Sequence, residues 1–202
     1  MKNRKPILFN TEMVQAILDG RKTQTRRVVK SRHESGEYLI CRNTISKEIV
    51  EIQSLDWDGN NCNKNVTCPY GKVGDVLWVR ETIVDDQETG WIYKNGTPCK
   101  CLNDISFQNG RNYIPSIHVP FEACRLFLQI TNIRIERLQD IGDADAANEG
   151  CIYGRGASVD PAVGNNIFIN LWQSIYGEES WNANPWVWVI EFNQITKEEA
   201  LS

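Results

Sequence analysis

Apolar residues recur at helical spacing in three stretches of the chain. The first stretch follows a capping residue at Asn10 or Thr11 and ends before Gly20. The second covers residues 143–149, is rich in alanine and predicts a helix of about two turns. The third covers residues 166–176 and is followed by a glycine. The apolar stripe of the first helix consists of Met13, Val14, Ile17 and Leu18.

Runs of β-branched and aromatic residues predict strands between these helices. A Thr- and Val-rich stretch after the first helix is typical of a turn that leads into a strand, on which Thr25 and Arg27 would share one face. Residues 76–82 predict a strand buried on at least one side. Residues 125–138 predict a strand pair or one long bent strand, and residues 186–192 predict a further strand.

Three longer segments carry little hydrophobic periodicity. In the first of them only residues 38–41 and 47–52 are patterned, and the polar run 56–64 is expected to be a loop. We interpret all three as insertions in a single domain that spans residues 1–202. Long loops of this kind are often functional. The insertions are expected near residues 31–72, 85–120 and 153–165.

Strands and helices do not alternate regularly along the chain. A strand-rich sequence with three helices and no βαβ repeat favours an α+β or small-barrel architecture over a doubly wound parallel sheet. The longest uninterrupted apolar run, residues 186–190, is far shorter than the roughly 20 residues of a membrane span. An odd number of cysteines without a signal peptide favours reduced thiols, so we expect a cytoplasmic protein without membrane partners.

Charge is distributed unevenly along the chain. Residues 1–33 hold nine lysines and arginines against two acidic residues, a local charge of +7, although the whole chain has a formal charge of −4. A protein that coats DNA should be basic overall, so this balance argues against such a role. A basic N-terminal segment can still bind an anionic ligand or a single strand of nucleic acid. The alternative is that these residues form a positively charged arm in solvent.

Lys22 lies in the densest group of basic and hydroxyl residues. It is surrounded in sequence by Arg21, Arg26 and Arg27, and Thr25 follows three residues later. Crowding by positive charge disfavours the charged form of the lysine, so a neutral amine could act as a base and activate the Thr25 hydroxyl. The C-terminal dipole of the preceding helix opposes this effect. A solvated turn is the alternative interpretation.

Glu149 is the candidate acid. At the C-terminal end of its predicted helix the dipole disfavours the ionised carboxylate, which is the direction wanted in a general acid. A surface glutamate beside a glycine cap is the alternative. The cysteine and histidine spacings do not match a zinc site, and no phosphate-binding glycine loop is present, so we expect neither a metal nor a cofactor.

Four short motifs follow one another along the chain: Gly20-x-Lys22-x-x-Thr25-x-Arg27, Gly74-Asp75-Val76-Leu77-Trp78-Val79, Asp145-Ala146-x-x-Glu149-Gly150 and Trp188-Val189-Ile190-Glu191-Phe192. In this order they resemble the ASCH domain of the PUA-like superfamily. A further set of segments more narrowly resembles the ASCH proteins of phages and prophages: residues 7–29, Cys68-Pro69-Tyr70-Gly71, Trp78-Val79-Arg80-Glu81-Thr82 and Asn184-Pro185-Trp186-Val187-Trp188. The resemblance reaches both ends of the chain. It implies a small β-barrel flanked by helices, with a basic cleft for RNA, a nucleotide or a modified base.

Within this family, a threonine at position 25 resembles the bacterial N(4)-acetylcytidine amidohydrolases. The resemblance implies that Lys22 and Thr25 stand at the positions of their catalytic lysine and threonine, and Glu149 at that of their catalytic glutamate. The chain departs from the minimal domain in its length, because of the three insertions.

These observations lead to one leading hypothesis and two alternatives. The leading hypothesis is an amidohydrolase that acts on an N-acylated cytosine nucleoside or a related modified base, with Lys22 as base, Thr25 as nucleophile and Glu149 as acid. Arg27 would stabilise an oxyanion or hold a phosphate. The first alternative is a non-catalytic module that binds RNA or a modified nucleotide, and the second is a single-strand ribonuclease. The residues expected to contact the ligand are Arg21, Arg26, Arg27 and Trp78.

Overall fold

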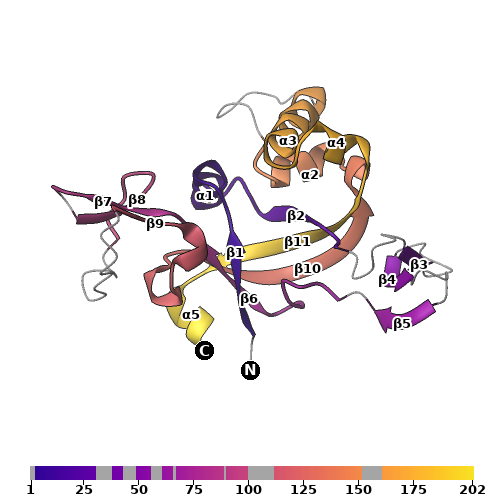
Figure 1. Cartoon of the computed structure of the whole chain (residues 1–202), viewed down its shortest axis with the longest axis horizontal. Helices are drawn as coiled ribbons and strands as arrows, with labels where there is room; N and C mark the ends of the chain where they lie inside the picture. Colours follow the sequence, from indigo (N-terminus) through magenta and orange to yellow (C-terminus); the bar gives the residue numbers. More distant parts are fainter. Residues whose placement is uncertain are drawn as a thin grey trace. The chain divides into compact units, whose positions relative to one another are not determined.

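The computed structural model describes residues 3–30, 38–42, 49–55, 61–65, 67–88, 90–99, 112–151 and 161–202. In this part the chain is α+β and forms two compact units (Figure 1). Unit 1 comprises Met1–Thr23, Tyr70–Thr131 and Phe192–Ser202, and unit 2 comprises Gln24–Pro69 and Asn132–Glu191. Within the described residues, no helix is both long enough and apolar enough to cross a membrane.

Unit 1 begins with a strand and a capped helix. The Asn10 side chain accepts a hydrogen bond from the Met13 amide at 2.8 Å, as expected of a helix cap. Gly20 follows the helix with φ +73°, a conformation that favours glycine. The elements of unit 1 are β1 (Arg4–Leu8), α1 (Thr11–Leu18), β6 (Val76–Arg80), β7 (Ile83–Asp86), β8 (Gly90–Tyr93), β9 (Tyr113–Ile114), η2 (Ser116–His118), η3 (Phe121–Ala123) and α5 (Lys197–Leu201).

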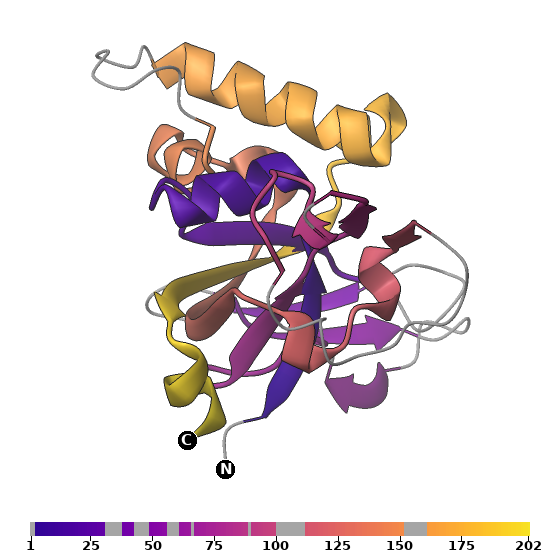
Figure 2. The ribbon, with the colours of Figure 1, turned by 90° about the vertical axis from the view of Figure 1, so that its left-hand side faces the viewer.

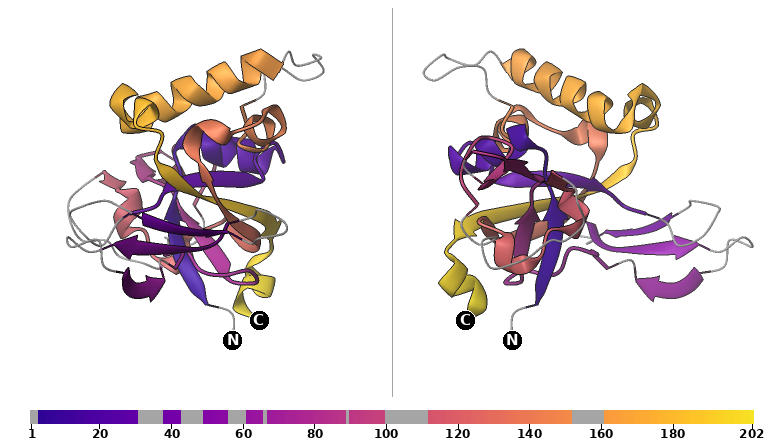
Figure 3. Two further views of the ribbon diagram at one scale, coloured as in Figure 1. Left: turned by 90° about the vertical axis from the view of Figure 1, so that its right-hand side faces the viewer. Right: turned by 60° about the vertical axis from the view of Figure 1, so that its left-hand side comes forward.

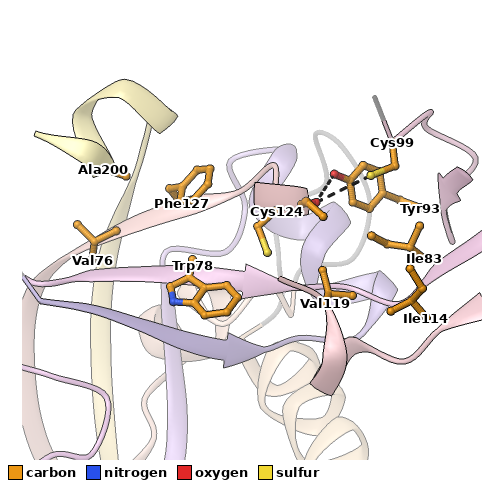
Figure 4. Close-up of a cluster of buried hydrophobic side chains, with 11 residues drawn as sticks. Val76, Trp78, Ile83, Tyr93, Cys99, Ile114, Val119, Cys124, Phe127 and Ala200 are labelled. Carbon is orange, nitrogen blue, oxygen red and sulfur yellow. Dashed lines mark hydrogen bonds between the residues drawn. The ribbon is translucent and has the colours of Figure 1, made fainter. Parts of the chain in front are cut away.

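The core of unit 1 forms around β6 and the small sheet of β7, β8 and β9. Figure 4 shows side chains from these strands meeting Phe127 and Ala200, which lie far apart in sequence. Trp78 is in this cluster, where its ring lies edge-on to Phe121 at 5.6 Å between centroids. The Tyr93 hydroxyl donates to the Ala123 carbonyl at 2.8 Å, so the one polar group of that buried ring is satisfied.

Unit 2 combines helices with a separate three-stranded sheet. The long helix α3 runs beside α2 and leads into α4 (Figure 2), and their apolar residues pack with Val187 and Val189. Strands β3, β4 and β5 pair in that order as an antiparallel sheet (Figure 3). The elements of unit 2 are β2 (Gln24–Val28), β3 (Tyr38–Arg42), β4 (Ile49–Leu55), β5 (Asn61–Asn65), η4 (Leu138–Asp140), α2 (Asp143–Asn148), α3 (Pro161–Tyr176) and α4 (Glu178–Asn182).

Two long strands belong to both units. They are β10 (Phe127–Arg137) and β11 (Trp186–Ile195), and the hydrogen-bonded order of the main sheet is β1-β6-β10-β11-β2. β1 runs parallel to β6, whereas β10 pairs with β6 and β11 with β2 in antiparallel register. The outer strands β1 and β2 have no pairing with each other among the described residues. The described sheet is therefore open, and the expected PUA-like barrel is not confirmed.

Several sequence predictions differ from the structure in the expected insertions. Residues 61–64 of the expected loop belong to β5, while residues 56–60 lie outside the described residues. The third helix begins at Pro161 rather than at position 166, and the rest of the loop expected over 153–165 lies outside the described residues. The expected irregular segment 85–120 contains β8 and β9. Polar strands such as Asn61–Asn65 lack the apolar alternation on which the prediction depended.

Candidate active site

Lys22 lies in unit 1, in the segment that follows α1. Its backbone amide donates to the Ala16 carbonyl at 3.0 Å, which anchors the segment to the last turns of the helix. Its Nζ lies 5.7 Å from the centroid of the Phe9 ring, within the range of a cation–π contact. Only 2% of the residue is exposed. A lysine is almost never buried to this degree without a structural or functional reason.

Lys22 also lines a small pocket of unit 1. The pocket has a volume of about 100 Å³ and lies between the end of α1 and the last part of β11. Its walls are both apolar and polar, so a small group with one hydrogen-bonding end would fit it. The lining residues are Ile17, Gly20, Lys22, Thr23, Phe192, Asn193 and Gln194.

Thr25 and Arg26 lie next to each other on β2 in unit 2 and point to opposite faces of it. Successive side chains of a strand alternate in direction. Arg26 contacts the carboxylate of Asp145 in α2, so Thr25 and Arg27 share the face of β2 that points away from this helix. Thr25 is 1% exposed and stands opposite Ile190 of β11. The structure therefore confirms the shared face of Thr25 and Arg27.

Arg26 is held by three carboxylates. Its Nη1 donates to Glu149 Oε1 at 3.3 Å, and its Nη2 donates to Asp145 Oδ2 at 2.8 Å and to Glu136 Oε2 at 3.0 Å. The Arg26 side chain is fully buried, and the ring of Phe168 lies 5.8 Å from its guanidinium carbon. The structure thus brings Arg26 and Glu149 together.

A second arginine completes this ion cluster. Arg134 binds both oxygens of Asp145, at 2.9 and 3.0 Å, and also pairs with Glu136 and Glu191. Two guanidiniums thus face four carboxylates, which leaves a formal charge of −2. We call these six residues the Arg26 cluster: Arg26, Arg134, Glu136, Asp145, Glu149 and Glu191.

Asp145 joins the two arginines of the cluster. Burial, the largest single influence, raises the pKa of its carboxyl, but Arg26 and Arg134 together outweigh burial and lower the pKa below its ordinary value. Burial likewise lowers the pKa of the Arg134 guanidinium, but Glu136 and Asp145 outweigh it, so that pKa is raised. Both partners therefore stay charged at neutral pH.

The spacing within α2 explains how two carboxylates reach one guanidinium. Asp145 and Glu149 are four residues apart, so they lie on the same side of this short helix. Ala146 is buried among Phe168 and Trp172 and fixes the side of α2 that faces the core. Glu149 is the C-cap and only 4% exposed, which matches its predicted place at the helix end.

The remaining predicted ligand contacts lie in different surroundings. Arg21 is partly exposed and pairs with Asp19 at 3.0 Å. Arg27 is half-buried and donates to the Arg26 carbonyl at 3.4 Å. Trp78 is in the core of unit 1, beneath Arg80, whose guanidinium carbon lies 4.3 Å from the ring centroid.

Sequence reasoning missed several members of the Arg26 cluster and a neighbouring glutamine. The signals were available for Asp145, four residues before Glu149, and for Arg134 and Glu136, which are two residues apart on one strand face. Gln24 donates to the Asp145 carbonyl at 3.4 Å, and its buried Oε1 has no hydrogen-bond partner among the described residues.

No group of three or more potential metal ligands is present in the described part of the chain. Comparison of the chain with protein-family models, with curated proteins and with solved structures gave no match. A functional proposal therefore has to rest on the residues and geometry of the site.

Proposed function

We propose that this protein is an amidohydrolase of the ASCH type, with a PUA-like fold, that removes the acyl group from an N-acylated cytosine nucleoside or a related modified base. One observation carries the proposal. Seven polar or charged residues are buried in the described part of the chain, and Lys22, Thr25 and Glu149 are three of them. Burying such groups costs free energy, and groups of this kind concentrate at functional sites.

Chain geometry supports a partnership of Lys22 and Thr25. Lys22 precedes Thr25 by three residues, and three residues of chain span at most about 11 Å when fully extended. Lys22 also lines the pocket of unit 1, which offers room for a small substituent. Lys22 would act as the base for the Thr25 hydroxyl.

In the proposed reaction Glu149 acts from the face of β2 opposite to that of Thr25, because Glu149 pairs with Arg26. β2 is the last strand in the order of the main sheet, so its outer edge carries no further described strand. A substrate at the outer edge of β2 could be contacted from both faces. Glu149 would then protonate the departing amine while Thr25 attacks from the opposite face.

The proposed reaction has two half-reactions. Thr25 Oγ1 bonds to the acyl carbon as neutral Lys22 takes the hydroxyl proton, and the C–N bond then breaks as Glu149 protonates the departing nitrogen. Water next attacks the Thr25 ester, giving one proton to Glu149 while Lys22 returns its proton to the threonine oxygen. The products are the free exocyclic amine and a carboxylic acid, and every group of the enzyme regains its starting state.

Arg27 and Arg21 are the arginines proposed to meet the substrate. Arg27 shares the Thr25 face and would stabilise the oxyanion or hold a phosphate, and Arg21 retains partial exposure. Trp78 is packed in a core, which favours a structural role for it.

The test is turnover of N(4)-acetylcytidine by the purified protein without added metal, with cytidine release followed by chromatography. We expect release by the wild type and a fall of at least about 10³-fold in Thr25→Ala and Lys22→Ala, because the nucleophile or its base is removed. Thr131→Ala, which changes an exposed threonine on β10, is the matched control and should keep wild-type turnover.

Absence of release at high enzyme concentration would contradict the amidohydrolase and favour the binding module. Such a module should bind RNA or a modified nucleotide with an affinity that falls steeply with salt and survives Thr25→Ala. Degradation of unmodified single-stranded RNA would instead favour the ribonuclease.

A further inference from the structure

We infer that Arg26 is a positioning residue that holds the Glu149 carboxyl group in place, rather than a contact for the substrate. This inference rests on the proposed function, because it assigns a role to Arg26 through Glu149. It differs from the sequence-based expectation, which grouped Arg26 with Arg21 and Arg27 as a ligand contact.

Burial separates Arg26 from the arginines that could meet a ligand. Its side chain is fully buried, whereas Arg27 on the next position of β2 is half-buried. The two Nη atoms of Arg26 are already engaged by Glu149, Asp145 and Glu136. An anionic substrate would have to displace a carboxylate to reach this guanidinium.

The surroundings of Arg26 fix its direction from several elements. Asp145 comes from α2, Glu136 from β10, and Phe168 of α3 lies under the guanidinium. Arg134 holds Asp145 and Glu136 in turn, and also pairs with Glu191 of β11. A planar guanidinium can serve three carboxylates at once because its donors have fixed directions.

Glu149 is therefore attached to a rigid framework through one of its oxygens. The charged groups that face it through this framework are Arg26, Asp145, Glu136 and, beyond them, Arg134 and Glu191. A displacement of about 1 Å in a reacting group can reduce the rate about 100-fold. Loss of the framework should thus reduce kcat and leave KM largely unchanged, because substrate binding does not involve Arg26.

The experiment compares Arg26→Lys with Arg125→Lys in the full chain. Lysine keeps the positive charge in both variants, but it cannot bridge carboxylates as arginine does. Arg125 is the matched control because it also pairs with a carboxylate, donating two hydrogen bonds to Glu81 in unit 1. We expect Arg26→Lys to reduce kcat by up to about 100-fold at unchanged KM, and Arg125→Lys to change neither constant.

Two outcomes would overturn the inference while leaving the amidohydrolase intact. One is wild-type kcat in folded Arg26→Lys. The other is a raised KM at unchanged kcat, which would make Arg26 a substrate contact. Circular dichroism establishes that each variant is folded. Asp145→Asn serves as a second variant, because it removes one charged partner of Arg26 and leaves Glu149 unchanged. It should also reduce kcat at constant KM.

A readout without turnover separates this inference from the proposed function. Carbon-13 NMR of protein labelled at the glutamate carboxyls can follow the Glu149 carboxyl signal, assigned by its loss in Glu149→Gln. Replacing Arg26 by neutral Gln should shift and broaden that signal, because the carboxyl group loses the hydrogen-bond donor that holds it in one position. An unchanged signal would contradict the inference, whereas an inactive wild type whose signal responds to Arg26→Gln would contradict only the proposed function.

Discussion

Each unit buries an arginine against carboxylates, but the two arrangements differ. In unit 1, Arg125 binds both oxygens of Glu81, at 2.9 and 2.7 Å, and its guanidinium carbon lies 3.9 Å from the Tyr93 ring centroid. That pair is balanced, one cation to one anion. In unit 2, Arg26 and Arg134 face four carboxylates, and Arg26 is more deeply buried than Arg125.

Charge balance and burial distinguish an ion pair that only stabilises the fold from one that belongs to a functional site. A balanced, geometrically complete pair needs no other explanation than its contacts. A surplus of carboxylates around a buried arginine costs free energy. A protein can retain such a surplus where one of the carboxylates has a function, and of the carboxylates in the Arg26 cluster only Glu149 is itself buried. Glu149 is the carboxylate of the Arg26 cluster that the sequence analysis predicted to be the general acid.

The largest expected difference concerns activity. Glu149→Gln should reduce kcat on N(4)-acetylcytidine by about 10²–10⁴-fold, the usual contribution of a general acid. Glu81→Gln makes the same chemical change in unit 1 and should leave kcat of the folded protein unchanged. Steady-state kinetics of both variants test this, and equal losses of kcat would remove the distinction between the two clusters.

The next largest difference concerns stability. Arg26→Met leaves three carboxylates around a buried apolar side chain and should lower the free energy of unfolding by about 3–5 kcal/mol. Arg125→Met should cost about 1.5–3 kcal/mol, because the Arg125–Glu81 pair is partly open to water. Urea unfolding measures both. Adding Asp145→Asn and Glu136→Gln to Arg26→Met should restore part of the loss, since the uncompensated charges are removed.

The stability contributed by Asp145 in unit 2 should be lost at acidic pH, and that contributed by Cys124 in unit 1 at alkaline pH. The pKa of Asp145 is lower in the folded than in the unfolded chain, where it is near 3.8, so its stabilisation is present above that pH and is lost as the pH falls. In unit 1, burial chiefly raises the pKa of the Cys124 thiol from 9.0 to about 12. The stability that Cys124 contributes is therefore complete below pH 9 and is lost between pH 9 and about 12.

Unfolding curves measured across pH test these two expectations, with one variant for the acidic range and one for the alkaline range. Asp145→Asn should flatten the loss of stability at acidic pH, and Cys124→Ala should flatten part of the loss at alkaline pH. Burial also raises the pKa of Tyr93, so some alkaline loss should remain in Cys124→Ala. If Asp145→Asn lost as much stability at acidic pH as the wild type does, that loss could not be assigned to Asp145 in the Arg26 cluster.

The smallest expected effect lies at the rim of the Arg26 cluster. Glu191 pairs with Arg134 where both side chains are about one-third exposed, so Glu191→Gln should cost only about 0–1 kcal/mol. Thermal unfolding at low and high salt measures this difference. A loss of stability as large as that expected for Arg26→Met would show that Glu191 is as important to the cluster as Arg26 is.

Local signals predicted much of the secondary structure. The cap at Asn10 and the glycine at position 20 bounded α1 correctly, and 125–138 proved to contain one long strand. The start of α3 was placed at Asn166, although Asp160 followed by Pro161 is itself a helix-start signal in the sequence. The strand Asn61–Asn65 was missed because a polar strand leaves little trace in hydrophobic periodicity.

The amino-acid sequence alone predicted the candidate site residues, which are a lysine, a threonine and arginines close together in the chain, and a glutamate at the end of a short alanine-rich helix before a glycine. These features depend on spacing along the chain, which helix and strand geometry translate directly into position. It did not distinguish Arg26 from Arg27, since adjacent residues of a strand are equivalent until one face is covered. The folded structure shows that α2 covers the Arg26 face, which the sequence could not indicate because burial and ion pairing depend on contacts between residues more than 100 positions apart.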